Sequence, residues 1–539
     1  MHGKRLVGIF CGVLLCCVGL CGRIFVLSSG DETAAAADRN STYTISIDRT
    51  RGMIYDSSLR PLLGGETTEI AVFFPGQESA EAIKSIFSDQ TERQKLLDRL
   101  AEGKAFGAAI PAGSSLPASI PVFEVEQRYS SRQAALHVIG YTDGEGRGIT
   151  GIERAYDSVL SAAEGTLQLR IRADALGRPL SGLEYEVTDT RNQSRKGVAL
   201  TISLPIQTIL QEAMDKLKTN GAAVVMEIST GKLRGVVSKP DYDPLALGDY
   251  LDRADAPFLN RAFAAFNVGS VFKIALAVAA HEKGMEDFTA FCRGSIDISG
   301  QEFGCHYPAG HGYLTLKTAI QRSCNPYFIA LGQKLGGEEI LRIASKLGFG
   351  SGTELCPGLV TESGNLPALQ ELTTPGAVAS LSFGQGSLLA TPIQLAEMMA
   401  TIAGGGRRVK ASLVEGITDA SGTSIAIPAA TEEQPRAIDR EVAAAVTAYM
   451  VNMVEKSSAD TLRPEECGGG GKTGTAETGW MMDGELAVQA WFAGFFPADN
   501  PKYAVAILAE NGGYGAEICG PIFKEIAEQI YFMEKYQEG

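Results

Sequence analysis

The longest apolar stretch in the chain runs from Leu6 to Leu27, close to its N-terminus. Apart from glycines, cysteines and Arg23 it holds only apolar side chains, and a helix needs about 20 such residues to cross a bilayer. Lys4 and Arg5 precede the stretch, and acidic residues follow it. The positive-inside rule therefore predicts a single-pass anchor in the cell membrane, over residues 1–28, with the rest of the chain on the extracytoplasmic side.

A cleaved signal peptide is the alternative interpretation of this segment. Ala35 and Ala37 form the small-residue pattern typical of a cleavage site. That pattern lies roughly ten residues beyond an apolar run that is already long, whereas a signal core has about 7–15 apolar residues. An uncleaved anchor fits better, and either interpretation exports the bulk of the chain.

The region that follows, up to about Leu200, shows few long periodic patterns. It predicts short strands and turns, plus one helical stretch from Glu81 to Leu100. A polar run from Thr188 to Gly197 then predicts a linker or an exposed turn. We therefore expect an N-terminal domain over residues 29–197 and a second domain over residues 198–539.

The second domain alternates strand-like and helical patterns. Strand-like runs occupy Ala222–Glu227, Leu233–Ser238, Val488–Phe496 and Tyr503–Glu510, and helical spacing follows over Pro521–Tyr536. The turn Ser229-Thr230-Gly231 joins the first two runs as a hairpin. Strands at both ends with helices between them predict one α+β domain whose sheet joins its two ends.

Composition limits the partners. At 539 residues the chain is too long for one ordinary domain, and its 45% hydrophobic and 21% charged residues are those of a globular protein. The net charge of −15 leaves no basic surplus to neutralise phosphates, so no nucleic-acid partner is expected.

Six of the ten cysteines lie outside the apolar N-terminal segment. Cys292 and Cys305 flank a strand-like run that contains Gly294 and Gly300, so a hairpin disulfide is a hypothesis for an oxidising compartment. The chain has no CxxC motif, no His/Cys cluster with zinc spacing and only five histidines, so we expect no metal site.

The candidate nucleophile is Ser270, three residues before Lys273 at the head of an apolar helical run. Residues three apart share a helix face, so the hydroxyl and the amine can meet. A desolvated lysine near another cation can activate a serine, and a helix N-terminus offers N–H groups to a developing oxyanion. A second S-x-x-K motif, Ser229–Lys232, falls on the predicted hairpin turn and lacks this helical context.

A second motif could contribute side chains to the same site as Ser270. Ser323-Cys324-Asn325 lies between two helical runs, Leu316–Arg322 and Phe328–Leu335, and would offer a hydroxyl and an amide to a cleft. Ser-x-Asn also occurs at Ser363–Asn365, so this motif alone is unspecific.

Lys472-Thr473-Gly474 occurs once, followed by Thr475. On an edge strand it could align a substrate backbone, with Lys472 and the threonine hydroxyls receiving a carboxylate. Gly474 would let the substrate approach closely. The alternative is a flexible glycine loop followed by a solvated lysine.

These three motifs in this order resemble the class B penicillin-binding proteins, over nearly the whole chain after the anchor. The resemblance extends to Arg51–Asp56, Gly151–Asp157, Asp174–Arg178, Asn260–Ala262, Gly310–Gly312, Gly384–Gly386 and Thr391–Ala396. It implies an α+β transpeptidase domain of the penicillin-binding and serine β-lactamase type, with an antiparallel five-stranded sheet, helices on both faces and an all-helical lobe. A non-catalytic N-terminal domain, elongated, mixed α/β and similar to a pedestal or dimerisation module, would precede it over residues 29–197, after one transmembrane helix.

The resemblance also implies an activity, a serine D,D-transpeptidase that crosslinks peptidoglycan and is acylated by β-lactams. Ser270 would attack the penultimate D-alanine carbonyl of a stem peptide, with Lys273 as general base. Ser323 and Lys472 would carry the proton to the leaving group. Asn325 would hold the substrate amide. Thr473 and Thr475 would bind the terminal carboxylate, and the N–H groups of Ser270 and Thr475 would form the oxyanion hole.

No cofactor is expected. Because the region from Ser28 to Leu200 shows no sign of a glycosyltransferase module, the resemblance implies a partner polymerase of the shape, elongation, division and sporulation family. Two alternatives stay open: a β-lactamase or β-lactam sensor that uses the same acylation chemistry, and a catalytically inactive scaffold of the wall-synthesis complex.

Overall fold

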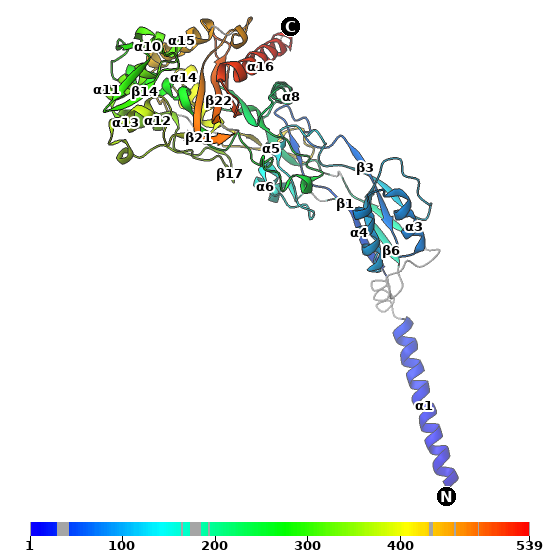
Figure 1. Cartoon of the computed structure of the whole chain (residues 1–539). Coiled ribbons are helices and arrows are strands. Elements are labelled where there is room, and N and C mark those ends of the chain that lie inside the picture. The colour runs from blue at the N-terminus through cyan, green and yellow to red at the C-terminus, as the bar shows by residue number, and fades with distance from the viewer. Residues whose placement is uncertain are drawn as a thin grey trace. The chain divides into compact units, whose positions relative to one another are not determined.

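The computed structural model describes residues 2–29, 42–162, 165–172, 185–191, 194–430, 435–457, 460–482 and 485–537 (Figure 1). Two compact units emerge from the contacts within the chain. Unit 1 comprises residues 1–51, 64–128 and 163–194, and unit 2 comprises residues 52–63, 129–162 and 195–539. Each unit is built from three separate stretches of the chain, so the units do not correspond to a single boundary. The domain boundary expected between residues 197 and 198 stays a prediction.

The N-terminal helix α1 spans His2–Ser29. Its segment Gly3–Val26 has a mean hydropathy of 2.4 and no buried side chains, so it is long and apolar enough to cross a membrane. The alanine pattern at Ala35 and Ala37 lies outside the described residues.

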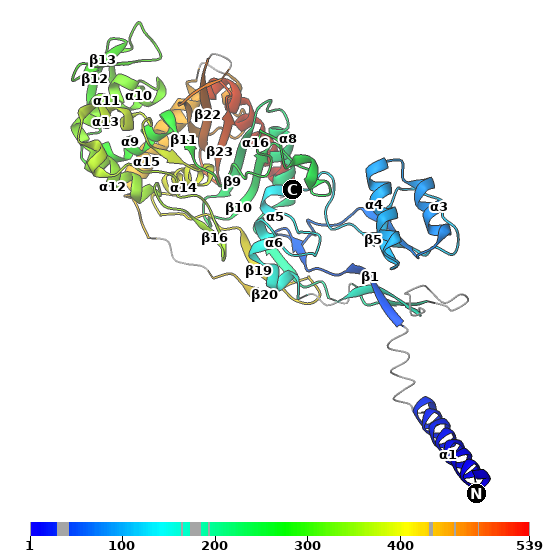
Figure 2. The ribbon, with the colours of Figure 1, turned by 60° about the horizontal axis from the view of Figure 1, so that its bottom comes forward.

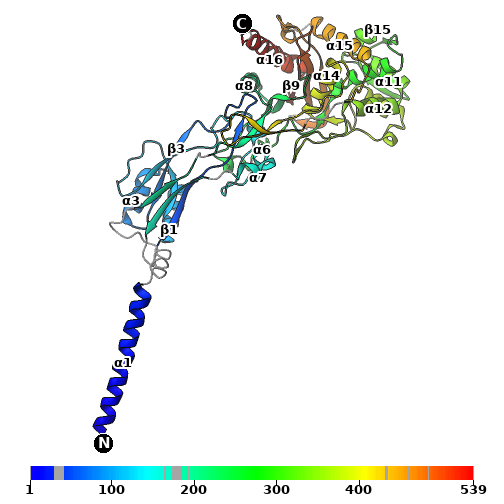
Figure 3. The same ribbon diagram turned by 180° about the vertical axis from the view of Figure 1, so that it is seen from behind.

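Unit 1 holds two three-stranded antiparallel sheets. One has the order β1-β6-β7 and the other β4-β3-β5. Figure 3 labels one strand of each sheet, β1 and β3. Their bounds are β1 Thr42–Arg49, β3 Thr67–Phe73, β4 Phe106–Ile110, β5 Val122–Glu126, β6 Thr166–Arg172 and β7 Glu186–Asp189.

The single helix expected over Glu81–Leu100 is wrong, because the structure has two helices there, α3 Gln77–Ile86 and α4 Gln90–Ala101. Phe87 adopts an extended backbone and is buried in the core. Asp89 caps α4 by accepting a hydrogen bond from the Glu92 N–H at 2.7 Å. A local cap and a buried ring thus outweigh the continuous helical spacing.

The polar run at Thr188–Gly197 is only partly a turn. Its first residues close β7, and residues 192–193 lie outside the described part of the chain. Gly197 begins β8, which spans Gly197–Leu200 and pairs in parallel with β2, Met53–Tyr55. Two later strands, β19 Val414–Thr418 and β20 Ile425–Pro428, complete a four-stranded sheet with the order β2-β8-β19-β20.

Asp56 follows β2 and is fully buried. Its carboxylate accepts hydrogen bonds from the N–H groups of Ser58 and Arg60 at 2.8 and 2.9 Å, and from that of Leu204 at 3.2 Å. The Arg51–Asp56 motif therefore has a structural use, since one carboxylate satisfies three backbone donors.

The central sheet of unit 2 has the order β10-β9-β23-β22-β21, and every pairing is antiparallel (Figure 2). The strands are β9 Gly221–Glu227, β10 Leu233–Lys239, β21 Gly470–Met482, β22 Glu485–Phe496 and β23 Tyr503–Glu510. The predicted hairpin and C-terminal strands are confirmed. Because β9 pairs with β23, the sheet joins the two ends of the domain as expected.

Helices cover both faces of this sheet (Figures 1 and 2). Helix α8 Leu204–Met214 and α16 Gly515–Gln537 pack on one face, and α14 Pro392–Ala403 packs on the other. The helix expected to begin at Pro521 begins at Gly515, so Pro521 lies inside it. Buried Cys519, whose thiol donates to the Ala490 carbonyl at 3.4 Å, holds the turn before the proline against β22.

Between β10 and β21 the chain forms a lobe of helices. It contains α9 Lys273–Glu282, α10 Leu316–Gln321, α11 Asn325–Leu335, α12 Gly337–Leu347 and α13 Pro375–Ser382, and α15 Arg440–Glu455 follows later in the chain. The expectation of an all-helical lobe is wrong in one respect. Two antiparallel pairs, β12 Thr289–Cys292 with β15 Gly312–Thr315 and β13 Ser295–Ile298 with β14 Gln301–Gly304, extend from it. In the second pair β13 alternates isoleucine with polar residues, and Ser299 and Gly300, both with positive φ, close the hairpin.

The remaining elements are short. They are α5 Leu136–Ile139, α6 Gly151–Ala155, α7 Asp157–Leu160, β11 Phe266–Asn267, β16 Glu354–Cys356, β17 Leu359–Val360 and β18 Leu389–Ala390. The resemblance motif at Gly151–Asp157 falls on α6, where buried Glu153 accepts a hydrogen bond from the Tyr129 hydroxyl at 2.9 Å. The motif at Asp174–Arg178 lies outside the described residues.

Candidate active site

Ser270 lies in a single 3-10 turn, Gly269–Phe272, that leads directly into α9. The side chain is half-buried, whereas the residues that follow it are fully buried. The predicted helix head is therefore confirmed, with a tighter first turn than expected. Such a turn leaves backbone N–H groups unpaired within the helix at the position of the serine.

Gly269 fixes where this turn sits. Its φ of 60° is left-handed, and a Cβ at this position would lie 2.7 Å from the Thr475 carbonyl oxygen. The Gly269 N–H donates to the Gly384 carbonyl at 2.9 Å. Only glycine lets the turn that bears Ser270 approach β21 this closely.

Lys273 is fully buried and points to the second motif. Its Nζ atom lies 2.6 Å from Asn325 Oδ1, 2.8 Å from the Ser323 carbonyl oxygen and 3.3 Å from Ser323 Oγ. Burial, and after it the charge of Lys472, hold the pKa of Lys273 well below its usual value. The geometry and the low pKa both suit a neutral amine that can accept a proton.

Lys472 lies on strand β21 of the central sheet, and its side chain also contacts Ser323. Its ammonium nitrogen lies 3.0 Å from Ser323 Oγ and 2.8 Å from the Thr473 carbonyl oxygen. Burial lowers the pKa of Lys472 to about 7. The Ser323 hydroxyl thus contacts both lysines, and it can pass a proton between Lys273 and Lys472.

Ser323 and Asn325 lie at the junction of α10 and α11. Ser323 has a left-handed φ of 49°, which is uncommon for a residue with a side chain. Asn325 is the first residue of α11, not part of a free loop, and its amide Nδ2 donates to the Gly304 carbonyl at 3.2 Å. That bond orients the amide so that its oxygen faces Lys273.

The third motif lies on β21, the edge strand of the central sheet, as predicted. Thr473 and Thr475 are half-buried and two residues apart, so they share one side of the strand. Gly474 differs from the expectation. A Cβ there would meet Val271 Cγ2 at 3.0 Å and the Val268 carbonyl oxygen at 3.1 Å, so this glycine makes room for the turn that bears Ser270.

The repeated motifs elsewhere have structural uses. Ser229–Lys232 forms the turn between β9 and β10, and Lys232 pairs with Glu415 at 2.8 Å. Asn365, in the second Ser-x-Asn motif, donates to the Ser387 carbonyl at 2.5 Å. Neither joins the Ser270 cluster among the contacts of the described residues.

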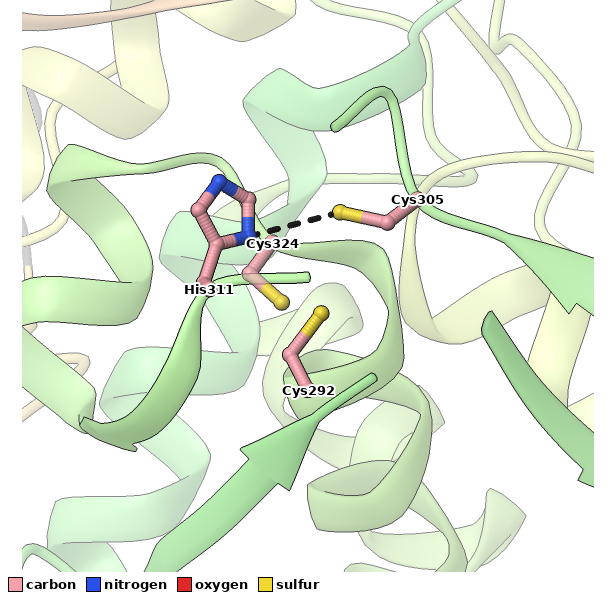
Figure 4. A group of neighbouring side chains, drawn as sticks. All are labelled: Cys292, Cys305, His311 and Cys324. Carbon is pink, nitrogen blue, oxygen red and sulfur yellow. Dashed lines mark hydrogen bonds between the residues drawn. The ribbon is translucent and has the colours of Figure 1, made fainter. Parts of the chain in front are cut away.

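Sequence reasoning missed two features of this site. One is the Gly304 carbonyl, a backbone group that has no sequence signal. The other is a group of four side chains behind the second motif, Cys292, Cys305, His311 and Cys324, whose ligand atoms all lie within 4.8 Å of one another (Figure 4). The cysteines are free thiols, so the hypothesis of a hairpin disulfide is not realised in this structure.

The amino-acid sequence of the chain is similar to a known family and to individual proteins of that family. Residues 221–528 match the family model described as the penicillin binding protein transpeptidase domain. The chain is 31% identical over 479 residues to the peptidoglycan D,D-transpeptidase PbpA of Mycolicibacterium smegmatis, covering 82% of this chain and 91% of that protein. The chain belongs to the class B penicillin-binding proteins.

Solved structures of other penicillin-binding proteins share this fold. A ceftriaxone acyl-enzyme complex of penicillin-binding protein A from Mycobacterium tuberculosis matches 91% of this chain and 99% of its own, with a TM-score of 0.65 and 23% identity. Penicillin-binding protein 2 of Helicobacter pylori, in a complex with MreC, matches 92% of this chain and 100% of its own, with a TM-score of 0.68 and 22% identity.

Proposed function

We propose that this class B penicillin-binding protein crosslinks peptidoglycan by serine acyl transfer, with Ser270 as the nucleophile. The observation that carries the proposal is that the three motifs meet at the hydroxyl of Ser323. Lys273 and Lys472 both contact Ser323, beside the turn that bears Ser270. Relatives named peptidoglycan D,D-transpeptidases support the same reaction.

The first half-reaction forms an ester. Ser270 Oγ attacks the penultimate D-alanine carbonyl carbon of a stem peptide while neutral Lys273 takes the hydroxyl proton. The C–N bond breaks, and the terminal D-alanine leaves with a proton delivered from Lys472 through Ser323. In the second half-reaction the amine of a neighbouring stem gives a proton to Lys472 through Ser323 and attacks the ester carbonyl. The new amide bond forms and the ester C–O bond breaks. Ser270 Oγ takes back the proton held by Lys273, so both lysines return to their starting states.

The remaining predicted residues bind substrate. The Thr473 and Thr475 hydroxyls, with protonated Lys472, receive the terminal carboxylate, and Asn325 holds a substrate amide. The backbone N–H groups of Ser270 and Thr475 stabilise the oxyanion. Gly474 serves this arrangement indirectly, because it lets the edge strand lie against the nucleophile turn.

β-Lactams would acylate the same hydroxyl, in keeping with the acyl-enzyme that penicillin-binding protein A of M. tuberculosis forms with ceftriaxone. The α1 helix would anchor the chain with Lys4 and Arg5 in the cytoplasm and residues 198–539 outside as the transpeptidase domain. A membrane polymerase of the shape, elongation, division and sporulation family is the proposed partner.

The test is a crosslinking assay on the full chain in detergent. A donor peptide ending in D-Ala-D-Ala and an acceptor peptide with a free amine should yield free D-alanine and a crosslinked dimer, and Ser270→Ala should abolish both. Rapid penicillin turnover without dimer formation would favour a β-lactamase. A Ser270→Ala chain that still supports growth of a strain lacking the wild-type protein would favour a scaffold.

A further inference from the structure

The group of Cys292, Cys305, His311 and Cys324 is assembled from four separate elements. Cys292 ends β12, Cys305 follows β14, His311 precedes β15 and Cys324 precedes α11. Figure 4 shows the four side chains converging, with the sulfurs of Cys292 and Cys324 directed toward each other and the His311 ring facing Cys305. All four ligand atoms lie within 4.8 Å of one another.

We propose that these four residues bind one zinc ion, and that the ion holds the Ser323-Cys324-Asn325 motif in place. Three thiolates and one imidazole form a closed tetrahedral donor set, which is typical of structural zinc. Zn–S and Zn–N bonds of about 2.3 and 2.05 Å place sulfur and nitrogen about 3.6 Å apart at tetrahedral angles. The Sγ atom of Cys305 lies 3.5 Å from His311 Nδ1.

Ordinary core packing accounts less well for this group. Buried cysteines often act as small apolar side chains, and these three are 2%, 8% and 0% exposed. Apolar packing does not, however, explain an imidazole nitrogen directed at a thiol. A disulfide does not explain the group either, because three sulfurs can form only one pair.

The second half of the proposal rests on the proposed function, since it concerns residues assigned to the acyl-transfer site. Cys324 stands between Ser323 and Asn325, and Cys305 follows Gly304, whose carbonyl accepts the hydrogen bond from the Asn325 amide. An ion that joins Cys324 to Cys305 therefore fixes the motif from both sides. It also stabilises the left-handed backbone of Ser323, which needs support from its surroundings.

This ion would be structural. Four protein ligands leave no open position for water or substrate, and the hydrogen bonds of Lys273 go to Ser323 and Asn325, not to the cluster. The four ligands would thus be positioning residues.

Metal content tests the first half. The full chain, purified in detergent and dialysed against metal-free buffer, should retain about one zinc per chain by mass spectrometry. Cys292→Ser and His311→Ala should each lower zinc to less than about a tenth of an equivalent. Cys356→Ser is the matched control, since Cys356 is a buried cysteine outside the cluster, and this variant should retain the ion.

Cobalt gives a readout on the wild-type chain that does not depend on how the variants fold. Co²⁺ added after zinc removal should produce the thiolate charge-transfer and intense ligand-field bands of a tetrahedral thiolate site. Retained zinc with these bands supports the site. Wild-type chain without zinc, an equivalent of iron in its place, or a disulfide among the three cysteines found by peptide mapping would overturn it.

The second half is tested by penicillin acylation. Cys292→Ser, which alters no residue of the motif, should slow acylation by about 10–100-fold while circular dichroism shows an intact fold. Unchanged acylation in a zinc-free, folded variant would overturn the positioning role. The two proposals fail separately: zinc bound by a chain that is never acylated refutes the proposed function, and acylation by a chain without zinc refutes the metal site.

Discussion

The side-chain nitrogen of Lys273 lies 2.6 Å from Oδ1 of Asn325, although the two residues belong to different helices. The same asparagine donates its amide hydrogen to the Gly304 carbonyl. Because the amide cannot turn without losing one of these bonds, Asn325 presents a neutral acceptor to a buried lysine. A neutral partner lets burial keep the pKa of Lys273 low.

Replacing that neutral acceptor with a charged one should therefore disable the base. In Asn325→Asp a carboxylate would favour the protonated form of Lys273 and raise its pKa. We expect penicillin acylation at neutral pH to fall by about 100-fold, and its ascending pH limb to move to higher pH. Stopped-flow acylation rates across pH measure both effects.

Asn365→Asp is the matched control, because Asn365 belongs to the other Ser-x-Asn motif and bonds the Ser387 carbonyl. It should leave the pH profile unchanged. An Asn325→Asp profile identical to that of the wild type would contradict the role given to Lys273.

The two lysines should give acylation a bell-shaped dependence on pH. Below the lowered pKa of Lys273 the base is protonated and the rate falls. Above about pH 7 Lys472 loses its proton, so attraction for the substrate carboxylate weakens. In Lys472→Arg the charge persists at higher pH, and we expect a lower maximum with the descending limb shifted upward. A descending limb that does not move would assign it to another group.

A methyl group at Gly269 should damage both fold and activity. Gly269→Ala must place a Cβ 2.7 Å from the Thr475 carbonyl in a left-handed conformation. Gly284→Ala meets only the conformational cost, because Gly284 has a φ of 64° and open space around its Cβ position. We expect Gly284→Ala to lower the free energy of unfolding by about 1–2 kcal/mol with normal acylation.

Gly269→Ala should lower the free energy of unfolding further and slow acylation by at least tenfold, because the nucleophile turn must move away from β21. Denaturant unfolding and penicillin labelling of both variants make the comparison. Equal acylation rates would show that the contact between Gly269 and Thr475 does not position Ser270.

The Arg51–Asp56 motif should prove structural. Asp56→Ala leaves three backbone N–H groups without their acceptor, and its partner Arg60 is half-exposed and can be rehydrated. We expect the free energy of unfolding to fall by roughly 2–4 kcal/mol, with unchanged acylation per folded molecule. Loss of acylation in a folded Asp56→Ala protein would instead give this motif a part in catalysis.

The sheet and the elements that carry the three motifs could be predicted because their signals are local. Alternating strands flank a turn at Ser229–Gly231, and each motif is a short run with a defined helix or strand around it. The break between α3 and α4 could not be predicted, since it depends on burial of Phe87. The start of α16 before Pro521 likewise depends on packing against β22.

The cysteine and histidine group could not be predicted for a related reason. Its members are far apart in sequence and match no familiar zinc spacing. Two short strand pairs, β12 with β15 and β13 with β14, bring Cys292, Cys305 and His311 together, and the turn before α11 supplies Cys324. Only tertiary structure makes them neighbours.

The most direct test of the account is covalent labelling by a fluorescent penicillin. Wild-type chain, Ser270→Ala and Ser229→Ala, which removes the serine of the other S-x-x-K motif, should be compared on a denaturing gel. We predict a persistent band for the wild type and for Ser229→Ala, and none for Ser270→Ala. A band that survives in Ser270→Ala, or a wild-type chain that leaves the drug intact and unbound, would contradict Ser270 as the acylated nucleophile.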